Sequence, residues 1–156
     1  MPFMESRKET PILDSINIGI YCLNFDEAKN FYIENLGFYI TMNSTIQCDS
    51  CTSRRLTMVH ESNKNFSIEF IHPSSIEQAH RVGSKGGTLN LFTLPTKNID
   101  TLKERLDKTA FFISYVETPY ASFLNVEDPM GNNIFLYEPC WITAIIHTRC
   151  LIQNSA

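Results

Sequence analysis

The sequence predicts an α+β protein built from two tandem modules, each with the element order strand, helix and three strands. Three observations support this prediction. The segment LNFDEAKNFY, which begins at Leu23, resembles the later segment KNIDTLKERL, which begins at Lys97, so the chain contains an internal repeat. A strand-like run precedes each copy, SINIGIYCL before the first and TLNLFTL before the second. Further runs with strand character follow each copy.

The repeat divides the chain into a first module, a linker, a second module and a C-terminal tail, which span residues 14–72, 73–87, 88–139 and 140–156. The linker, PSSIEQAHRVGSKGG, contains one proline and three glycines, and SSIEQAHR within it suits one or two helical turns. This composition is typical of a connector between two folded units.

The predicted helices have recognisable ends. In the first helix, Asn24 and Glu27 suit a capping box and Gly37 suits the C-terminal end. The apolar residues that share one face of this helix are Ala28, Phe31, Tyr32 and Leu36. In the second helix, Asn98 is the expected N-cap and Asp100 suits the positive end of the helix dipole. The apolar residues on one face of the second helix are Leu102 and Leu106.

Three strand candidates follow each helix. They are FYITMNST, RRLTMVHES and NFSIEFIHP in the first module and FFISYVE, ASFLNVE and NNIFLYEP in the second. The turn DPMGNN is a strong signal, because Pro129 suits a turn position and Gly131 is free to take a positive φ. Successive side chains of a strand point to opposite faces, so we expect one face of each strand against the helix and the other toward a cleft.

The charge balance argues against a nucleic-acid binder. The formal net charge is −4, and no basic run exceeds Arg54 and Arg55, whereas phosphate-backbone binders carry a basic stripe. Residues 1–10 lack the apolar segment of a signal peptide, and the longest apolar run, CWITAIIHTRCLI, is too short to span a bilayer. We therefore expect a cytoplasmic protein that binds neither nucleic acid nor membrane.

The cysteines suggest reduced thiols. Their number is odd, at 5, which does not suit a complete disulfide framework. Cys48 and Cys51 form a single CxxC in a polar context that reads as a loop, and a zinc site usually needs a second such pair. We expect structural or incidental thiols rather than a metal or redox site.

Three segments resemble the vicinal oxygen chelate superfamily, which includes glyoxalase I, bleomycin-resistance proteins, fosfomycin-resistance enzymes and extradiol dioxygenases. INIGIYCLNFDEAKNFYIENLGF is similar to the opening strand and helix of that family, NIDTLKERL to its second helix, and FLNVEDPMGNNIFLYEP to its closing turn and strand. The resemblance covers residues 14–139. It implies that two paired βαβββ modules form a U-shaped, partly open, barrel-like cleft.

Metal-dependent members of that superfamily place ligands on the first and last strands of each module, and the ion holds the oxygens of the substrate. By resemblance, these positions fall on Asn17 and Glu69 in the first module and on Leu91 and Phe135 in the second. Only Glu69 is a good ligand, and a single carboxylate does not hold a transition metal. We therefore expect no metal, no other cofactor and a cleft with a largely apolar lining.

The candidate ligand-binding residues lie on strands expected to line the cleft. They are Asn17, Tyr21, Met58, His60, Glu69, Leu91, Phe135 and Tyr137. Glu69 has two interpretations, as an outward solvated group or as an inward carboxylate. An inward carboxylate needs a partner such as Arg54, Arg55, His60 or a ligand. Phe135 either forms an aromatic wall or plugs the cleft. We identify no catalytic residue, because no Cys/His or Ser/His/Asp set is supported.

These observations favour a metal-independent protein that binds and sequesters a small aromatic or cationic molecule. The alternative is a lyase, isomerase or dioxygenase of the same superfamily that uses Glu69 as a base or holds a metal through other residues. A third reading is a partner-binding protein with a plugged cleft. We also expect a homodimer, because such assemblies are common. The apolar tail residues Trp141, Ile142, Ile145 and Ile146 suit a cover over the cleft, a contact with the sheet or a dimer interface.

Overall fold

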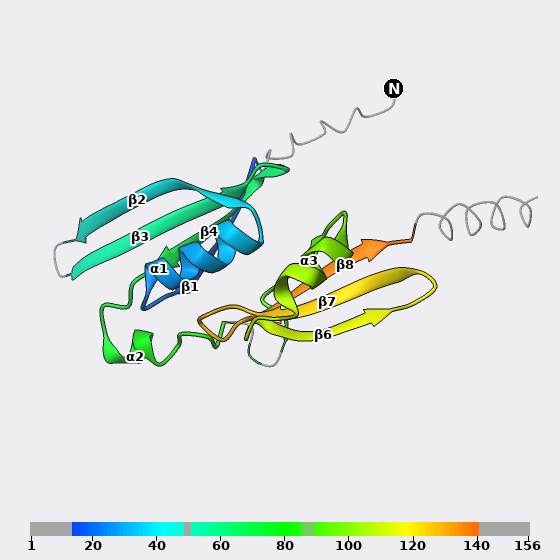
Figure 1. Cartoon of the computed structure of the whole chain (residues 1–156). Helices are drawn as coiled ribbons and strands as arrows, with labels where there is room; N and C mark the ends of the chain where they lie inside the picture. The colour runs from blue at the N-terminus through cyan, green and yellow to red at the C-terminus, as the bar shows by residue number, and fades with distance from the viewer. Residues whose placement is uncertain (1–13, 49–50, 86, 88, 141–156) are drawn as a thin grey trace, which may run out of the picture.

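A computed structural model describes residues 14–48, 51–85, 87 and 89–140 of the chain (Figure 1). The first module contains β1 (Ile16–Tyr21), α1 (Phe25–Lys29), its π-helical continuation η1 (Asn30–Asn35), β2 (Phe38–Cys48), β3 (Cys51–His60) and β4 (Asn63–Ile71). The second module contains β5 (Phe92–Pro95), α3 (Ile99–Leu106), β6 (Phe112–Glu117), β7 (Ala121–Glu127) and β8 (Asn133–Pro139). The α+β class and the two βαβββ modules predicted from the sequence are confirmed.

The connector contains α2 (Ile76–Ala79), which is the short helical turn expected there. No helix in the described part of the chain is long and apolar enough to cross a membrane. The expectations for Trp141 and the rest of the apolar tail lie outside the described residues.

Both modules fold their strands into sheets of one design. The strand order is β1-β4-β3-β2 in the first sheet and β5-β8-β7-β6 in the second, so the first strand of each module pairs with its last. That pair is parallel in each module, whereas the other pairs are antiparallel. The pairing shifts between Ile40 and Met42 on β2 and between Phe112 and Ser114 on β6. The two modules therefore also share an irregularity in the strand that follows their first helical segment.

One hydrophobic core joins the modules, and α1 and α3 lie on the same side of the two sheets (Figure 1). Phe31 of η1 packs edge-to-face on Phe111 with ring centroids 4.8 Å apart, and Phe66 of β4 packs on Phe92 of β5 at 5.6 Å. Because the helix-facing sides of both sheets meet in this core, the opposite faces lie on the outside of the chain. We call these opposite faces the open faces of the two sheets.

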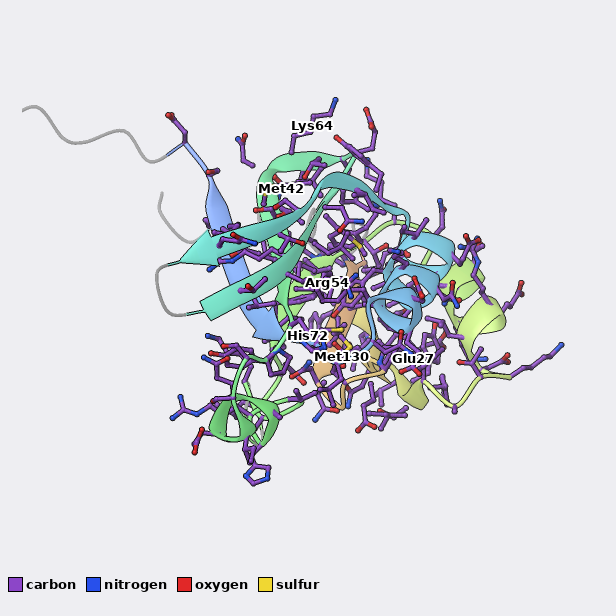
Figure 2. All side chains as sticks on the ribbon, turned by 90° about the vertical axis from the view of Figure 1, so that its left-hand side faces the viewer. Glu27, Met42, Arg54, Lys64, His72 and Met130 are labelled. Atoms are coloured by element: carbon purple, nitrogen blue, oxygen red, sulfur yellow. The ribbon has the colours of Figure 1, made fainter. Side chains whose placement is uncertain are left out.

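The turn between β7 and β8 ties the two modules together. Asp128 is only 3% exposed and accepts a hydrogen bond from the hydroxyl of Tyr32 in the first module at 2.8 Å. The same carboxylate accepts from the N–H groups of Met130 and Asn132 at 3.0 and 2.8 Å. Gly131 has a φ of 90°, as the turn signal predicts, and Met130 lies near the centre of the molecule (Figure 2). The turn is therefore a buried polar link as well as a local bend.

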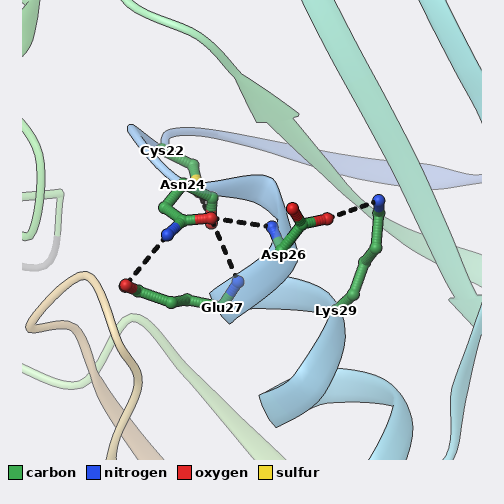
Figure 3. Close-up of polar contacts among 5 residues, drawn as sticks. All are labelled: Cys22, Asn24, Asp26, Glu27 and Lys29. Atoms are coloured by element: carbon green, nitrogen blue, oxygen red, sulfur yellow. Dashed lines mark hydrogen bonds and ion pairs between the residues drawn. The ribbon is translucent and has the colours of Figure 1, made fainter.

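Asn24 caps the start of α1, as the sequence predicts, but Glu27 bonds to the side-chain amide of Asn24 and not to its backbone N–H as in a capping box (Figure 3). Asn24 Oδ1 accepts hydrogen bonds from the N–H groups of Asp26 and Glu27, at 3.0 and 3.3 Å. Asn24 Nδ2 donates to Glu27 Oε1 at 2.9 Å. These bonds satisfy donors that the first helical turn otherwise leaves without partners. The helical segment ends as predicted, because Gly37 has a φ of 75° and its N–H donates to the carbonyl of Ile33.

The start of α3 differs from the prediction. Asn98 precedes the helix, but its φ is 62° and its side chain makes no capping hydrogen bond. Instead, the N–H of Ile99 donates to Glu138 Oε2 on β8 at 2.7 Å. A carboxylate also suits the positive end of the helix dipole. The cap thus comes from a residue far along the chain, which local sequence patterns do not reveal.

The hairpin of β2 and β3 is longer than the sequence indicates. Cys48 and Cys51, expected in a polar loop, are the last residue of β2 and the first of β3, and they pair across the hairpin. Residues 49 and 50 lie outside the described residues. Both strands therefore extend into the polar segment that the sequence predicts as a loop.

Cys22 is a buried thiol that we expect to be unreactive in the folded protein. It is 0% exposed, its Sγ donates to the carbonyl of Asn24 at 3.3 Å (Figure 3), and burial raises its pKa to about 12. Only the thiolate attacks a disulfide reagent. A variant with every cysteine except Cys22 replaced by serine should therefore react with such a reagent at pH 8 about 1,000-fold more slowly than a cysteine peptide.

Two further measurements check this expectation for Cys22. In denaturant the thiol should react at the peptide rate, because unfolding removes the burial. The folded pKa lies above the ordinary value of 9.0, so the protonated thiol is favoured by folding. Its contribution to stability is present below pH 9.0 and is lost as the pH rises toward about 12. Fast labelling of the folded variant would contradict the burial described here.

Candidate ligand-binding site

The open face of the first sheet carries polar residues that the sequence singled out. On β1 this face presents Asn17, Gly19 and Tyr21, and on β4 it presents Glu69, which pairs with Gly19. The residues between them point into the core, and they include Ile20, Ile68 and Phe70. Asn17, Tyr21 and Glu69 therefore share one face, as alternation along the strands requires.

Glu69 is not a lone acid, because Arg55 pairs with it. Arg55 Nη1 lies 3.0 Å from Glu69 Oε1, and the two side chains are 33% and 16% exposed. The inward interpretation of Glu69 required a partner, and Arg55 of β3 supplies it. The pair leaves no net charge at this point of the face, so the carboxylate offers little attraction to a cationic ligand.

Met58 and His60 do not face the open side, contrary to the expectation from the sequence. Met58 is 0% exposed and pairs with Ile68, which also lies in the core. His60 packs edge-to-face on Phe38 with ring centroids 5.4 Å apart. Directly paired residues on neighbouring strands point to the same side of a sheet, so Ile68 fixes the side of Met58. On β3 the residues of the open face include Arg55 and Thr57.

The open face of the second sheet is aromatic. On β8 it presents Phe135 and Tyr137, and Phe123 of β7 pairs with Tyr137. The rings of Phe123 and Phe135 are stacked, with centroids 5.4 Å apart and an interplanar angle of 21°. All three side chains are partly exposed. They form an aromatic surface that a planar molecule can contact.

Leu91 lies outside the strand on which the sequence placed it. β5 begins at Phe92, and Leu91 packs against the core instead of lining the open face. The N–H of Leu91 donates to the carbonyl of Asn133 at 2.7 Å, and Thr93 is the residue opposite Phe135. A strand of 4 residues offers little alternation from which to fix its position in a sequence.

Thr57 and Asn125 are additional candidates that the sequence pattern does not single out. Thr57 pairs with Glu69 and Asn125 pairs with Phe135, so the two residues occupy equivalent places in the two modules. Thr57 Oγ1 and Asn125 Oδ1 are buried and have no hydrogen-bond partner among the described residues. A buried polar atom needs a partner from water or a ligand. Only the strand register identifies these two residues and Phe123 as candidates, and the register is known only from the fold.

A pocket of about 550 Å³ lies at the free edge of β1. Its floor comes from the first sheet and its wall from the connector, and its lining residues include Gly19, Tyr21, Ile71, Arg81, Ser84 and Lys85. The volume lies in the range of small-molecule sites. The connector therefore shapes part of the open side of the first module as well as linking the modules.

The described residues do not fit the divalent metal that the fold family implies. No group of three His, Cys, Asp or Glu side chains comes together in the described part of the chain. Glu69 is engaged by Arg55, and Phe135 carries no donor atom. A transition-metal site in a protein needs several such donors around one ion. We therefore derive no chemical step through a metal.

Comparisons with solved structures bear on the fold. The chain is similar to a member of the glyoxalase/bleomycin resistance protein/dioxygenase superfamily from Sphaerobacter thermophilus, with a TM-score of 0.63 and 23% identity, over 81% of this chain and 98% of that one. It is similar to TnmS3, an antibiotic binding protein from Streptomyces sp. CB03234, with a TM-score of 0.58 and 20% identity, over 86% and 100% of the chains. A glyoxalase family protein from Bacillus cereus has a TM-score of 0.67 and 17% identity, over 86% and 99%. No protein-family model matches the sequence, and no curated protein matches it.

Proposed function

We propose that this chain, which has the vicinal oxygen chelate fold, binds a small aromatic molecule and sequesters it without the help of a metal. The observation that carries the proposal is the stacked pair of Phe123 and Phe135 on an open face, with Tyr137 beside it. Partly exposed rings on a sheet offer aromatic contacts and apolar burial to a planar ligand, at about 25 cal/mol per Å² before ordering costs.

The comparisons support a binding role. TnmS3 is an antibiotic binding protein, and the two chains share a fold at 20% identity. The ligand class follows from the residues of this chain. The aromatic class suits the second sheet. The carboxylate of Glu69, one of the features that favoured a cationic ligand, is neutralised by Arg55. The enzymatic alternative loses its candidate base for the same reason, because Glu69 is engaged in this ion pair.

We propose further that the working form is a homodimer. The open faces lie on the outside of the chain, so a ligand on one of them would keep much of its surface in water. Small-molecule sites bury most of their ligand, which requires a second wall. In a two-fold dimer the aromatic face of one copy can oppose the face of the other copy that carries Glu69. Apolar side chains that would gain burial are Tyr39, Met42 and Val116, which are 37%, 40% and 53% exposed.

Titration with 9-anthracenemethanol, a neutral planar fluorophore, tests the proposed function. We expect saturable binding in fluorescence anisotropy and a sedimentation mass twice that of the 17.9 kDa chain. Phe135→Ala and Phe123→Ala should each weaken binding about 10-fold, because each removes one ring of the stacking surface. Both side chains are partly exposed, so these variants should keep the fold.

A matched control separates stacking from general adsorption. Leu89→Ala removes an apolar side chain that is 75% exposed and should leave the affinity unchanged. If the fluorophore fails to bind, or binds equally well to the wild type and to both phenylalanine variants, the aromatic face is not a ligand site.

A further inference from the structure

The pocket at the free edge of β1 is lined by two cationic side chains that have no acidic partner in the described part of the chain. Arg81 and Lys85 belong to its wall, and neither forms an ion pair with any described residue. Among the residues that the structure describes, no aspartate or glutamate lines the pocket. Glu69, which pairs with Gly19 of the floor, is already neutralised by Arg55. The pocket therefore has a positive potential that no described neighbour cancels.

The floor of the pocket adds hydrogen-bond donors and apolar surface. The N–H of Cys22 donates to the carbonyl of Ile71 at 3.0 Å, so it points toward β4. Successive N–H groups alternate between the two edges of a strand, so the N–H groups of Gly19 and Tyr21 point to the free edge. The edge of a sheet can offer such groups to an anion. A Cβ at position 19 would lie 3.3 Å from Ile71 Cδ1, so glycine keeps the floor open.

The connector holds the wall of the pocket in place. The N–H and Oγ of Ser84 both donate to the carbonyl of Arg81, at 3.2 and 2.8 Å. Between these residues, Gly83 has a φ of 73°, and a side chain there would collide with the carbonyl oxygen of Met130. The connector is thus packed closely on the turn between β7 and β8. This packing holds the backbone from which Arg81 extends, two residues before Gly83.

We propose that this pocket binds a small organic anion whose carboxylate or phosphate group meets Arg81 and Lys85. The apolar body of the anion would lie against Tyr21 and Ile71. Charge-assisted hydrogen bonds from guanidinium and ammonium groups are among the strongest in proteins, and a volume of about 550 Å³ accommodates such a molecule. The floor of this site belongs to the face of the first sheet that the proposed homodimer sets opposite the aromatic face, but its charged groups come from the connector and no aromatic residue of the second sheet lines it. The proposal therefore goes beyond the proposed function, because it adds an anion site whose charged groups take no part in stacking.

Four probes that share one benzene ring test the preference for negative charge: benzoate, phenyl phosphate, benzamide and benzamidine. We expect one of the two anions to bind at least about 10-fold more tightly than neutral benzamide, and cationic benzamidine to bind most weakly. Comparison of benzoate with phenyl phosphate shows which acid group the site prefers. In an NMR titration the shifts should centre on the amides of Gly19 and Tyr21, and salt should weaken binding.

Charge-removing variants locate the site. Arg81→Gln and Lys85→Gln should each reduce the preference for the anion over benzamide at least about threefold, and the double variant should abolish it. Lys64→Gln is the matched control, because Lys64 projects into solvent from the first module (Figure 2) and its side chain is 63% exposed. Binding of 9-anthracenemethanol should be unchanged in all three single variants. Equal binding of benzoate, phenyl phosphate and benzamide, or a preference that survives in the double variant, would overturn the proposal.

Discussion

Asp128→Ala is expected to lower the free energy of unfolding by about 3–4 kcal/mol, one of the two largest effects we predict. The wild-type carboxylate is 3% exposed and accepts from the hydroxyl of Tyr32 and from the N–H groups of Met130 and Asn132. Alanine removes these acceptors and leaves buried donors unpaired, each at about 1–3 kcal/mol when no water enters. Urea denaturation followed by circular dichroism measures the change.

Two further variants separate the causes. Asp128→Asn keeps an acceptor oxygen in the turn and should lose less than half as much as alanine. Asp26→Ala removes a carboxylate that is 85% exposed and should change stability by less than about 1 kcal/mol. A loss for Asp128→Ala no larger than that of Asp26→Ala would show that the buried link between the modules contributes nothing.

The difference in stability between the wild type and Asp128→Asn should change with pH in a defined direction. Burial raises the pKa of Asp128 above its ordinary value of 3.8, although its hydrogen bonds with Asn132, Tyr32 and Met130 oppose the shift. A carboxyl group with a raised folded pKa binds its proton more tightly in the folded state, so its contribution to stability falls as the pH rises from 3.8 through the folded pKa. The stability of the wild type relative to Asp128→Asn should therefore decline over that interval.

Gly83→Ala should destabilise the protein by more than about 2 kcal/mol. Two effects add at this position. Gly83 has a φ of 73°, a conformation that costs a residue with a side chain about 1–2 kcal/mol. A Cβ there would also collide with the carbonyl oxygen of Met130, and backbone atoms cannot move aside as a flexible side chain can. Thermal and urea denaturation give the difference in stability.

Gly87→Ala is the matched control for this prediction. Gly87 also has a positive φ, of 59°, but a Cβ at this position would meet nothing within 4 Å. We expect this variant to lose only the backbone contribution, about 1 kcal/mol. Equal losses for the two variants would mean that the connector does not pack on the turn between β7 and β8. A larger loss at Gly83 should be accompanied by weaker benzoate binding, because this contact positions Arg81.

The sequence was most informative where its signals are local. The N-cap at Asn24, the end of the first helical segment at Gly37 and the turn at Gly131 each depend on residues within a few positions of one another. The repeat beginning at Leu23 and Lys97 also revealed two modules of one design, because it records the same order of elements twice. Local geometry and periodicity were sufficient for these predictions.

The sequence was least informative where strands meet. Alternation places Met58 and His60 on one side of β3, but either side satisfies the pattern, and the pairing of Met58 with Ile68 selects the core. The short strand β5 gave too few residues to place Leu91. In the same way, the cap of α3 comes from Glu138 on β8, which lies far from α3 in the sequence.

By itself, then, the sequence determined the fold class, the two modules and the residues that can form each helix and strand. Tertiary structure alone decided which of those residues meet. It paired Glu69 with Arg55, stacked Phe123 on Phe135 and brought the connector at Arg81 beside the edge of β1. The physical reason is that capping, turns and periodicity act over a few residues, whereas contacts between strands depend on register, and register is fixed only when a whole sheet packs on its core.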